Sequence, residues 1–450
     1  MSKKFLVSFL LVNSIICCYY LDTWENGNTT SRMLAVMNVV NSGTFQFDNQ
    51  QARTFDKACI RGHYYSEKAP LPMLMVIPFY KLITCLGYQE NGEGKIIYIL
   101  GSVLCGVIPF LIISLLFLKA AAKEPHSFSP VLLSMLPLYA SFIFIYSSTF
   151  YNHLLAALFL LLSYIYLKKG SLFLAGLFIG LSFLSEYSVA VIIAVWGLQL
   201  CLKKKTVRAL LEFAAGASPA ILFILVYNYI FTGSPFLMLY KFHTSFVTEA
   251  ETLYGFSYPK LKALWGLTFS LYRGLFFYAP FLLFYFFYLI NKWIKYSPKM
   301  IAKKILQSYS GLATLSLLIV LSSETGWWGG WAYGPRYLLL IAVLLTYKGV
   351  IYLSSIQFSK IAFLGVTIFG LICALSAKIT VLYSIPTDRM NPFTEIIWPA
   401  IIHSDFNPNN LLTMLLGIAP VIGAALFVLL FILGVIFLQR TDVKQKQPEH

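Results

Sequence analysis

The chain has 450 residues, of which 58% are hydrophobic and only 12% charged, and its mean hydropathy is +0.74. Repeated apolar runs near the ~20 residues that cross a bilayer as a helix exclude a soluble globular protein and indicate an all-α polytopic membrane protein. The formal net charge of +16 does not indicate nucleic-acid binding, because the Lys and Arg residues lie mainly in short loops between apolar runs.

The apolar runs predict about twelve transmembrane helices. They cover residues 4–20, 96–118, 130–146, 153–168, 171–185, 187–202, 207–231, 272–291, 304–322, 336–354, 359–384 and 411–438. A further run at 70–87 contains Lys81 and interrupting prolines. Since a lysine at a helix centre costs on the order of 3 kcal/mol, we expect this run to lie on the outer membrane surface as an amphipathic or re-entrant helix.

The basic residues support this topology. With 70–87 outside, both chain ends are cytoplasmic and most of the 34 basic residues fall on the cytoplasmic side, as the positive-inside rule requires. The opposite topology would place the lysine-rich loops at 203–208 and 292–304 outside. We therefore predict one transmembrane domain over 1–440 and a cytoplasmic tail over 441–450. The expected outer segments are 21–95, 232–271, 322–335 and 385–410.

The first outer segment contains the stretch "RTFDKACIRGHYYSEKAP" at 53–70. Asp56 and Glu67 could each act as a general base toward a hydroxyl or as a metal ligand. Lys68 offers a point charge suited to a phosphate, and His63 could act as a ligand or a proton shuttle. The alternative is a solvated loop whose charges only pair with one another.

The position of this stretch favours a site. It runs directly into the membrane-surface segment, so its charges lie at lipid-headgroup height, where Tyr64 and Tyr65 are natural interfacial anchors. A site there can meet a lipid-borne phosphate.

A second cluster, "SSETGWWGGWAYGPRYLLL", covers 322–340. Its glycines predict a tight outer loop, and Trp328 and Trp331 could stack on sugar rings or lie at the headgroups. Arg336 begins the next helix from the outer side. It could hydrogen-bond a phosphate bidentately, or it could only extend to the interface.

Other polar residues lie near helix ends or in the second outer segment. Asn152 and His153 start a helix, and Glu186 lies in a short turn that is either a functional site or a plain polar turn. The segment 232–271 holds His243, Glu249 and Glu251, and the two glutamates are best explained as solvated loop residues. A second surface helix is expected at 260–274.

Three stretches carry a resemblance to a known family: "NTTSRMLAVMNVVNSGTFQFD", "TFDKACIRGHYYSEKAP" and "WWGGWAYGPRYLL". They resemble the motifs of bacterial membrane glycosyltransferases of the GT-C superfamily, in the branch of protein O-mannosyltransferases and lipid A aminoarabinose transferases. The resemblance extends over nearly the whole chain in a shared order. It implies a GT-C-like fold whose long first outer loop carries membrane-surface helices.

The resemblance also implies a reaction. Such enzymes take a sugar from a polyprenyl-phosphate donor and pass it, usually with inversion, to a hydroxyl of a lipid, glycan or protein. The site would lie on the periplasmic side of a bacterial inner membrane, in contact with membrane lipids. His63, Tyr65, Trp328 and Trp331 are the candidates for contacts with the substrates.

The site residues follow the family motifs. Glu67-Lys68 before Pro70 matches a pair that binds a metal and the donor phosphate, although Ala69 replaces a more usual proline. Arg32, from the Ser31-Arg32 pair, and Arg336 would also bind the phosphate.

The general base is less clearly marked. Where relatives often carry an acid three positions before Arg32, this chain has Thr29. The general base is therefore either Asp56, which we favour, or Asp22. A divalent metal held by Asp56 and Glu67 is the one cofactor expected.

Two other function classes predict different features. A flippase or transporter of lipid-linked sugars should carry ionisable residues or broken helices at mid-membrane in both halves, whereas the polar groups here concentrate at the outer face. A non-catalytic envelope assembly protein would not need its outer acids for function.

Overall fold

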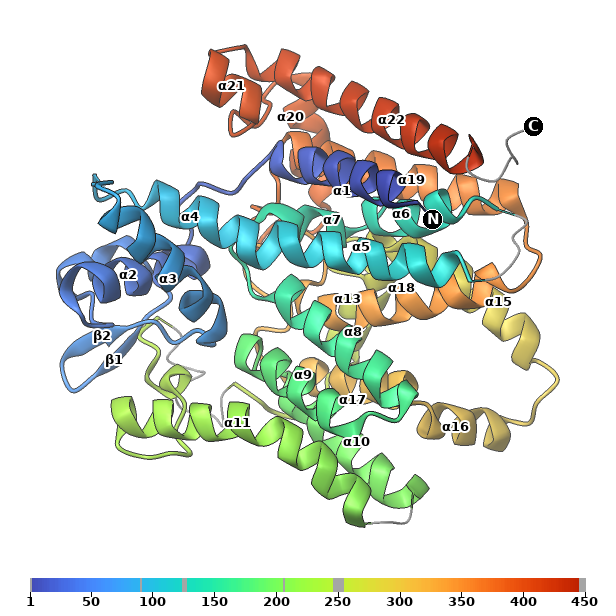
Figure 1. Cartoon of the computed structure of the whole chain (residues 1–450), viewed down its shortest axis with the longest axis horizontal. Helices are drawn as coiled ribbons and strands as arrows, with labels where there is room; N and C mark the ends of the chain where they lie inside the picture. The colour runs from blue at the N-terminus through green and yellow to red at the C-terminus, as the bar shows by residue number, and fades with distance from the viewer. Residues whose placement is uncertain (1, 90, 124–127, 205–206, 246–254, 445–450) are drawn as a thin grey trace.

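The computed structural model describes residues 2–89, 91–123, 128–204, 207–245 and 255–444 (Figure 1). This described part is mostly helical, as the apolar runs predict, with one small two-stranded hairpin. Glu249 and Glu251 lie outside the described residues.

Five helices are long and apolar enough to cross a bilayer. They are Lys95–Ala121 (α4, Lys95–Ser102; the π-helical turn η2, Val103–Val107; α5, Ile108–Ala121), α11 (Val207–Thr232), Arg336–Ser354 (η5, Arg336–Leu338; α18, Leu339–Ser354), α19 (Lys360–Ile379) and Pro420–Asp442 of α22 (Pro420–Lys444). Two bent pairs raise the number to at most seven among the described residues. The chain is therefore a multi-pass membrane protein, and about twelve crossings stays a prediction.

Several further helices coincide with predicted runs and are shorter than the five helices above. They are α1 (Lys3–Cys18), α8 (His153–Lys169), α9 (Leu172–Ser185), α10 (Val189–Lys204) and α15 (Pro280–Trp293). At a rise of 1.5 Å per residue, each is about 21–26 Å long, less than the ~30 Å apolar core of a typical bilayer. Length alone therefore does not decide how these helices cross.

The two bends have local causes. α6 (Pro130–Tyr139) contains Pro137 and turns by 74° into α7 (Phe142–Ile145) and η3 (Tyr146–Ser148). α16 (Pro298–Gln307) turns by 94° into α17 (Tyr309–Ser323). At this second bend the Ser308 side chain accepts a hydrogen bond from the Gly311 N–H and starts a new helix. The predicted run 304–322 is thus divided between two helices.

Small residues let α9 and α11 approach closely. A Cβ on Gly176 would lie 2.0 Å from the Phe213 carbonyl oxygen, and one on Gly216 would lie 2.0 Å from that of Phe173. Helix pairs in membranes associate through such small residues. This contact, together with the packing of α8 on α9, fixes the turn between α9 and α10 against the start of α8.

The first expected outer segment forms a layer at one end of the bundle, on the left of Figure 1. It comprises α2 (Gly27–Ser42), η1 (Asp48–Arg53), β1 (Ala58–Ile60), β2 (His63–Tyr65) and α3 (Leu71–Cys85). Met33, Met73 and Tyr80 belong to an apolar core shared by α2, α3 and α4. The helix expected in 70–87 is therefore present, with Pro78 inside it and Lys81 exposed.

The later expected outer segments carry short elements. They are η4 (Leu239–Phe242), α13 (Leu261–Thr268), η6 (Phe393–Ile397) and α20 (Trp398–Ile402). Two further short helices, α14 (Leu275–Tyr278) and α21 (Leu411–Leu416), lie near the starts of the predicted apolar runs 272–291 and 411–438. α13 falls inside the surface helix expected at 260–274, and its Leu261 and Trp265 side chains are exposed.

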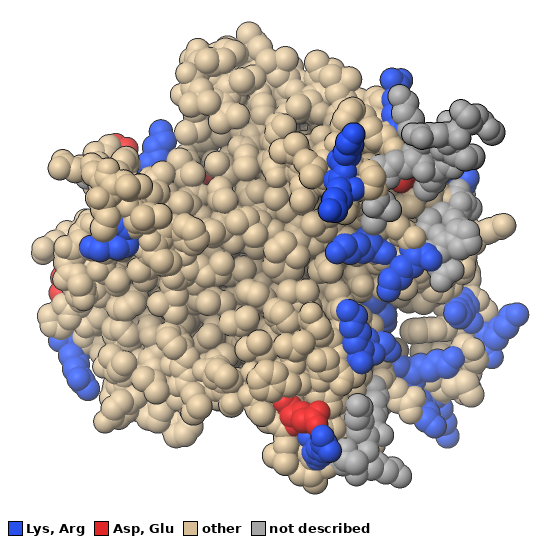
Figure 2. All heavy atoms as spheres, viewed as in Figure 1, with Lys and Arg blue, Asp and Glu red and all other residues tan. Residues whose placement is uncertain are grey.

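Basic side chains gather at the opposite end of the bundle. Figure 2 shows Lys and Arg concentrated toward the right of the view, where α1 begins and α22 ends in Figure 1. Lys119, Lys168, Lys299 and Lys303 are exposed residues of α5, α8 and α16. The layer that carries Asp56 and Glu67 thus lies at the end away from these helix termini.

Candidate active site

Asp56, Glu67 and Lys68 meet because the chain between them folds back as a hairpin. Ala58 pairs with Tyr65 across β1 and β2, so the residues just before β1 and just after β2 lie side by side. The turn is Arg61-Gly62, in which both residues have positive φ, the pattern of a tight two-residue hairpin.

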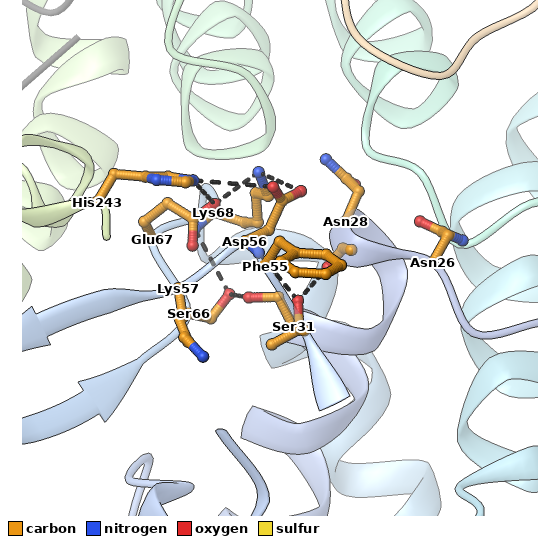
Figure 3. A network of polar contacts seen from close by, with 12 residues as sticks. Asn26, Asn28, Ser31, Phe55, Asp56, Lys57, Ser66, Glu67, Lys68 and His243 are labelled. Carbon is orange, nitrogen blue, oxygen red and sulfur yellow. Dashed lines mark hydrogen bonds and ion pairs between the residues drawn. The ribbon is translucent and has the colours of Figure 1, made fainter. Parts of the chain in front are cut away.

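The three side chains form a largely buried ionic cluster, in which Glu67 is fully buried and Asp56 and Lys68 are partly exposed (Figure 3). Lys68 Nζ lies 2.9 Å from Asp56 Oδ2 and 2.6 Å from Glu67 Oε1. His243 joins from another part of the chain, because it forms an isolated β-bridge with Ala58. Its Nε2 lies 3.7 Å from both Asp56 Oδ1 and Glu67 Oε1. We call these four residues the acid–lysine cluster.

Asp56 and Lys68 favour the ionised forms of one another. Burial alone would raise the pKa of Asp56, but the Lys68 ammonium and His243 outweigh it and hold that pKa below its ordinary value. Burial alone would lower the pKa of Lys68, but Asp56 and Glu67 raise it above its ordinary value. Asp56 is therefore a carboxylate and Lys68 an ammonium at neutral pH.

The same cluster could hold a metal ion. One ligand atom from each of Asp56, Glu67 and His243 lies within 4.8 Å of the other two. Two carboxylates and an imidazole fit a divalent ion such as zinc or manganese. Lys68 now touches both carboxylates, so a metal ion would compete with its ammonium group.

The start of α2 is fixed against this cluster. Asn26 caps the helix by accepting a hydrogen bond from the Thr29 N–H. The Thr54 hydroxyl donates to the Gly27 carbonyl, and the Ser31 hydroxyl donates to Ser66 Oγ at 2.8 Å. A Cβ on Gly27 would lie 3.2 Å from the Asp56 carboxyl carbon, so only glycine fits without a shift.

Arg32 extends a second buried polar network from α2 to the bundle. Its guanidinium donates to Asn28 and to Asn152 Oδ1, the latter at 2.7 Å. The Asn152 amide donates in turn to Glu186 Oε2 at 2.5 Å, and Glu186 Oε2 lies 2.6 Å from His153 Nδ1. In the described part of the chain, Arg32 makes no direct ion pair with a carboxylate.

Arg336 is a buried cation held by aromatic rings. Its guanidinium carbon lies 5.2 Å from the ring centres of both Tyr151 and Tyr337, and among the described residues it has no ion-pair partner. A Cβ on Gly329 would lie 3.1 Å from Arg336 Nε, which explains a glycine there. Since a buried cation without a counter-ion is costly, the surroundings of Arg32 and Arg336 suit an anionic ligand.

Arg273, which the sequence did not mark as a candidate, contacts the backbone of the predicted loop at 326–335 that carries Trp328 and Trp331. The Arg273 side chain is fully buried and donates to the carbonyls of Trp328, Gly330 and Ile385. Trp328 is partly buried and packs edge-on against Trp327, whereas Trp331 is 58% exposed.

Asp22 lies outside the acid–lysine cluster. It is buried, accepts a hydrogen bond from the Tyr383 hydroxyl at 2.9 Å and caps the Trp24 N–H. Burial raises the pKa of Asp22 to about 7, against the opposing effect of these hydrogen bonds. The Asn26 amide also donates to the Tyr383 hydroxyl, which links Asp22 to the start of α2.

His63 and Tyr65 point to a different surface. His63 Nδ1 lies 2.7 Å from Asp48, and the Tyr65 hydroxyl accepts from Gln46. Both line a surface pocket of about 390 Å³ with Arg61 and Phe231. The structure therefore brings together Asp56, Glu67 and Lys68, places Arg32 and Arg336 in buried polar surroundings, and leaves Asp22, His63 and Tyr65 with other partners.

Neither a family model nor a curated protein matches the chain. Three solved structures are similar to it at low sequence identity. ArnT from Cupriavidus metallidurans bound to undecaprenyl phosphate has a TM-score of 0.45 and 14% identity, over 98% of this chain and 77% of ArnT. Its apo state has a TM-score of 0.46 and 14% identity, over 98% and 76%.

The third is the archaeal oligosaccharyltransferase AglB from Archaeoglobus fulgidus, in complex with an inhibitory peptide and a dolichol-phosphate. It has a TM-score of 0.46 and 12% identity, over 86% of this chain and 57% of AglB. ArnT and AglB are GT-C glycosyltransferases, the superfamily whose motifs the sequence resembles.

Proposed function

We propose that this chain is a membrane glycosyltransferase that moves a sugar from a polyprenyl-phosphate donor to a hydroxyl of a lipid, glycan or protein acceptor. The observation that carries the proposal is the buried acid–lysine cluster, with the buried cations Arg32 and Arg336 unpaired by carboxylates in the described chain. Together they offer a base for a hydroxyl and positive charge for a phosphate.

The donor phosphate is the anion that these cations would bind. Lys68 supplies a compact charge, and Arg336 and Arg32 supply planar guanidinium groups suited to phosphate oxygens. A sugar could stack on the exposed Trp331 or on Trp328. His63 and Tyr65 line a pocket on a different surface from Asp56, so we propose no part for them in the transfer step.

The reaction is a displacement at the anomeric carbon. The acceptor hydroxyl attacks that carbon, the bond from carbon to phosphate oxygen breaks, and the electron pair leaves with the polyprenyl phosphate. Asp56 accepts the hydroxyl proton, while Lys68 and the arginines stabilise the charge that grows on the phosphate. Its lowered pKa makes Asp56 a weak base, so it acts late, when bond breaking has already made the hydroxyl acidic.

Asp22 is the alternative base. Its raised pKa of about 7 would make it the stronger proton acceptor, but its carboxylate is engaged by the Tyr383 hydroxyl. We favour Asp56 because it adjoins the lysine that would hold the phosphate.

A divalent ion would be held by Asp56, Glu67 and His243. When bound, it would supply additional positive charge for the leaving phosphate. The residues of the chain still position the acceptor and accept its proton.

The distribution of charge supports a site on the outer face of a bacterial inner membrane. Exposed lysines gather at the bundle end away from the acid–lysine cluster, in agreement with the positive-inside rule. The site would then meet donor and acceptor lipids at headgroup height.

The test compares the envelope of a deletion strain complemented with the wild type, Asp56→Asn or Asp48→Asn. Asp48 is an acid of the same outer segment that pairs with His63 and serves as the matched control. Mass spectrometry of lipids, glycans and proteins should show one sugar modification that is restored by the wild type and Asp48→Asn but not by Asp56→Asn.

The product is then tested directly. The purified chain in liposomes should transfer that sugar from its polyprenyl phosphate to the identified acceptor. Movement of the lipid-linked sugar across the bilayer without transfer would instead favour a flippase. Complementation by Asp56→Asn at matched expression would contradict the proposed role of the cluster.

A further inference from the structure

His153 and Glu186 form a buried acid–base pair with no role in the reaction proposed above. His153 begins α8 and is 3% exposed, and Glu186 lies in the turn between α9 and α10. His153 Nδ1 lies 2.6 Å from Glu186 Oε2. A carboxylate beside Nδ1 holds a proton on that nitrogen and orients the ring, which leaves Nε2 as the reactive nitrogen.

The second nitrogen of this ring has no protein partner. Neither ring nitrogen makes a hydrogen bond of regular geometry to a described residue; Nδ1 lies in ion-pair contact with Glu186, whereas the buried Nε2 has no such contact. Buried polar atoms normally have a hydrogen-bond partner, so an unpartnered one invites a ligand.

The surroundings of His153 indicate the charge of that ligand. Its ring centre lies 5.9 Å from those of Tyr151 and Tyr337, the same two rings that contact the Arg336 guanidinium. Tyr146 packs edge-on against it. On the other side, Glu186 connects through Asn152 to Arg32.

The charged groups that face His153 are therefore two arginines and one glutamate. With the imidazole protonated, three cations would face a single carboxylate. This excess of positive charge suits an anionic ligand. A phosphate bound by Arg336 would bring a negative charge to the imidazole and favour its protonated form.

We propose that His153, oriented by Glu186, is the catalytic acid that protonates the departing polyprenyl phosphate. The inference rests on the proposed function and adds a second proton transfer to it. The pair would thus complete an acid–base arrangement, with Asp56 on the acceptor side and His153 on the leaving-group side.

The proton balance explains why such an acid is useful. The donor is a phosphate diester with one negative charge. When its bond to the sugar breaks, the oxygen keeps the electron pair and the phosphate monoester carries two negative charges. A proton from His153 Nε2 returns it to a single charge and leaves the imidazole neutral. The acceptor proton taken by Asp56 goes to solvent, and His153 takes up one proton before the next turnover.

The pH dependence of turnover separates this role from a structural one. The acid must be protonated, so turnover should fall as pH rises through the pKa of His153 in the donor complex. His153→Asn should lose about 10²-fold in turnover and lose this high-pH decline. Glu186→Gln removes the charge that stabilises the imidazolium, so the decline should move to lower pH.

The experiment measures turnover against pH for the purified chain in liposomes with its polyprenyl-phosphate sugar. It compares the wild type, His153→Asn, Glu186→Gln and His403→Asn, in which an exposed histidine is the matched control. An unchanged high-pH decline in both His153→Asn and Glu186→Gln would overturn the proposal. Absence of transfer by the wild type would instead count against the proposed function.

Folding is checked separately by membrane insertion and size-exclusion chromatography. If His153→Asn does not insert into the membrane, the Glu186→Gln variant alone tests the proposal. A high-pH decline in turnover that moves to lower pH in Glu186→Gln supports His153 as the catalytic acid, and an unmoved decline overturns the proposal.

Discussion

Lys68 Nζ lies 2.9 Å from Asp56 Oδ2, across the base of a hairpin, and the ammonium simultaneously touches Glu67. This ion pair joins the residue proposed to accept a proton to the residue proposed to hold a phosphate. It also sets the charge state of both, because each favours the ionised form of the other. Changing one partner should therefore alter the kinetics in a way that identifies its role.

We predict that Asp56→Asn and Lys68→Ala will separate catalysis from donor capture. Asp56→Asn should lower turnover by about 10²-fold with little change in the donor KM, because it removes the base. Lys68→Ala should chiefly raise the donor KM, and Lys68→Arg should restore part of the affinity. Steady-state transfer at varied donor concentration measures both constants. Equal loss of turnover and affinity in the two variants would mean that the cluster is only structural.

The metal gives a further prediction at the same cluster. If Asp56, Glu67 and His243 share a divalent ion, Glu67→Gln should weaken its binding and added ion should partly restore turnover. Metal content of the purified wild type and Glu67→Gln, measured by mass spectrometry, provides a readout independent of activity. If the wild type and Glu67→Gln contain equal amounts of metal and added ion does not restore turnover, the charge of the carboxylates is balanced by Lys68 and not by a metal ion.

We expect Arg336→Ala to raise the donor KM by about tenfold or more, since a charge-assisted hydrogen bond contributes roughly 1.5–3 kcal/mol. Arg389→Ala, which changes an exposed arginine paired with Asp388, serves as the control. Both variants should insert into the membrane normally. An unchanged KM for Arg336→Ala would mean that its guanidinium only packs against Tyr151 and Tyr337.

The sequence predicted the positions of the helices better than it predicted their lengths. Apolar runs located α11, α18 and α19 closely, but the division of 304–322 depends on one capping residue, Ser308, inside an otherwise helical pattern. Twelve crossings do not follow from length and composition, because several apolar helices are shorter than the bilayer core.

The sequence can anticipate which candidate site residues meet only where their contacts are local. Asp56, Glu67 and Lys68 are close in sequence, and a two-residue turn brings them together. His243 could not be assigned to them, because its position depends on a bridge to Ala58 between distant segments. The His153–Glu186 contact likewise depends on how α8 and α9 pack, although both are polar residues at the ends of predicted helices.

Asp22 provides a prediction about stability and pH. Its pKa in the folded chain, about 7, lies above the ordinary value of 3.8, so the folded state binds more protons between these two values. Stability should therefore decrease as pH rises from about 4 to 7. Asp22→Asn keeps an acceptor for Tyr383 but no longer ionises, so it should flatten this decrease. Thermal unfolding in detergent over that pH range measures it, and equal slopes for the two proteins would refute the buried, neutral carboxyl.

The expected topology can be tested at position 92, between α3 and α4. Residues 21–95 should all lie outside, so Gly92→Cys should react with a membrane-impermeant thiol reagent added to the outer face. The background should lack the exposed Cys85 and Cys201. Reaction only from the cytoplasmic face would mean that 70–87 crosses the membrane, which would reverse the side of every later loop.

Gly27 offers a test of the geometry around Asp56 without removing any charge. A methyl group there would lie 3.2 Å from the Asp56 carboxyl carbon, closer than a Cβ normally approaches a neighbour. Gly27→Ala should therefore push the carboxylate away from its position beside Lys68. The carboxylate must then shift by a few tenths of an ångström. Since a misplacement of about 1 Å in a catalytic group can cost 10²-fold in rate, turnover should fall several-fold while thermal stability changes little. Gly365→Ala, where a methyl group would meet no atom within 4 Å, is the matched control and should keep full turnover. If Gly27→Ala also keeps full turnover, the position of Asp56 is not critical and Asp22 becomes the stronger candidate for the base.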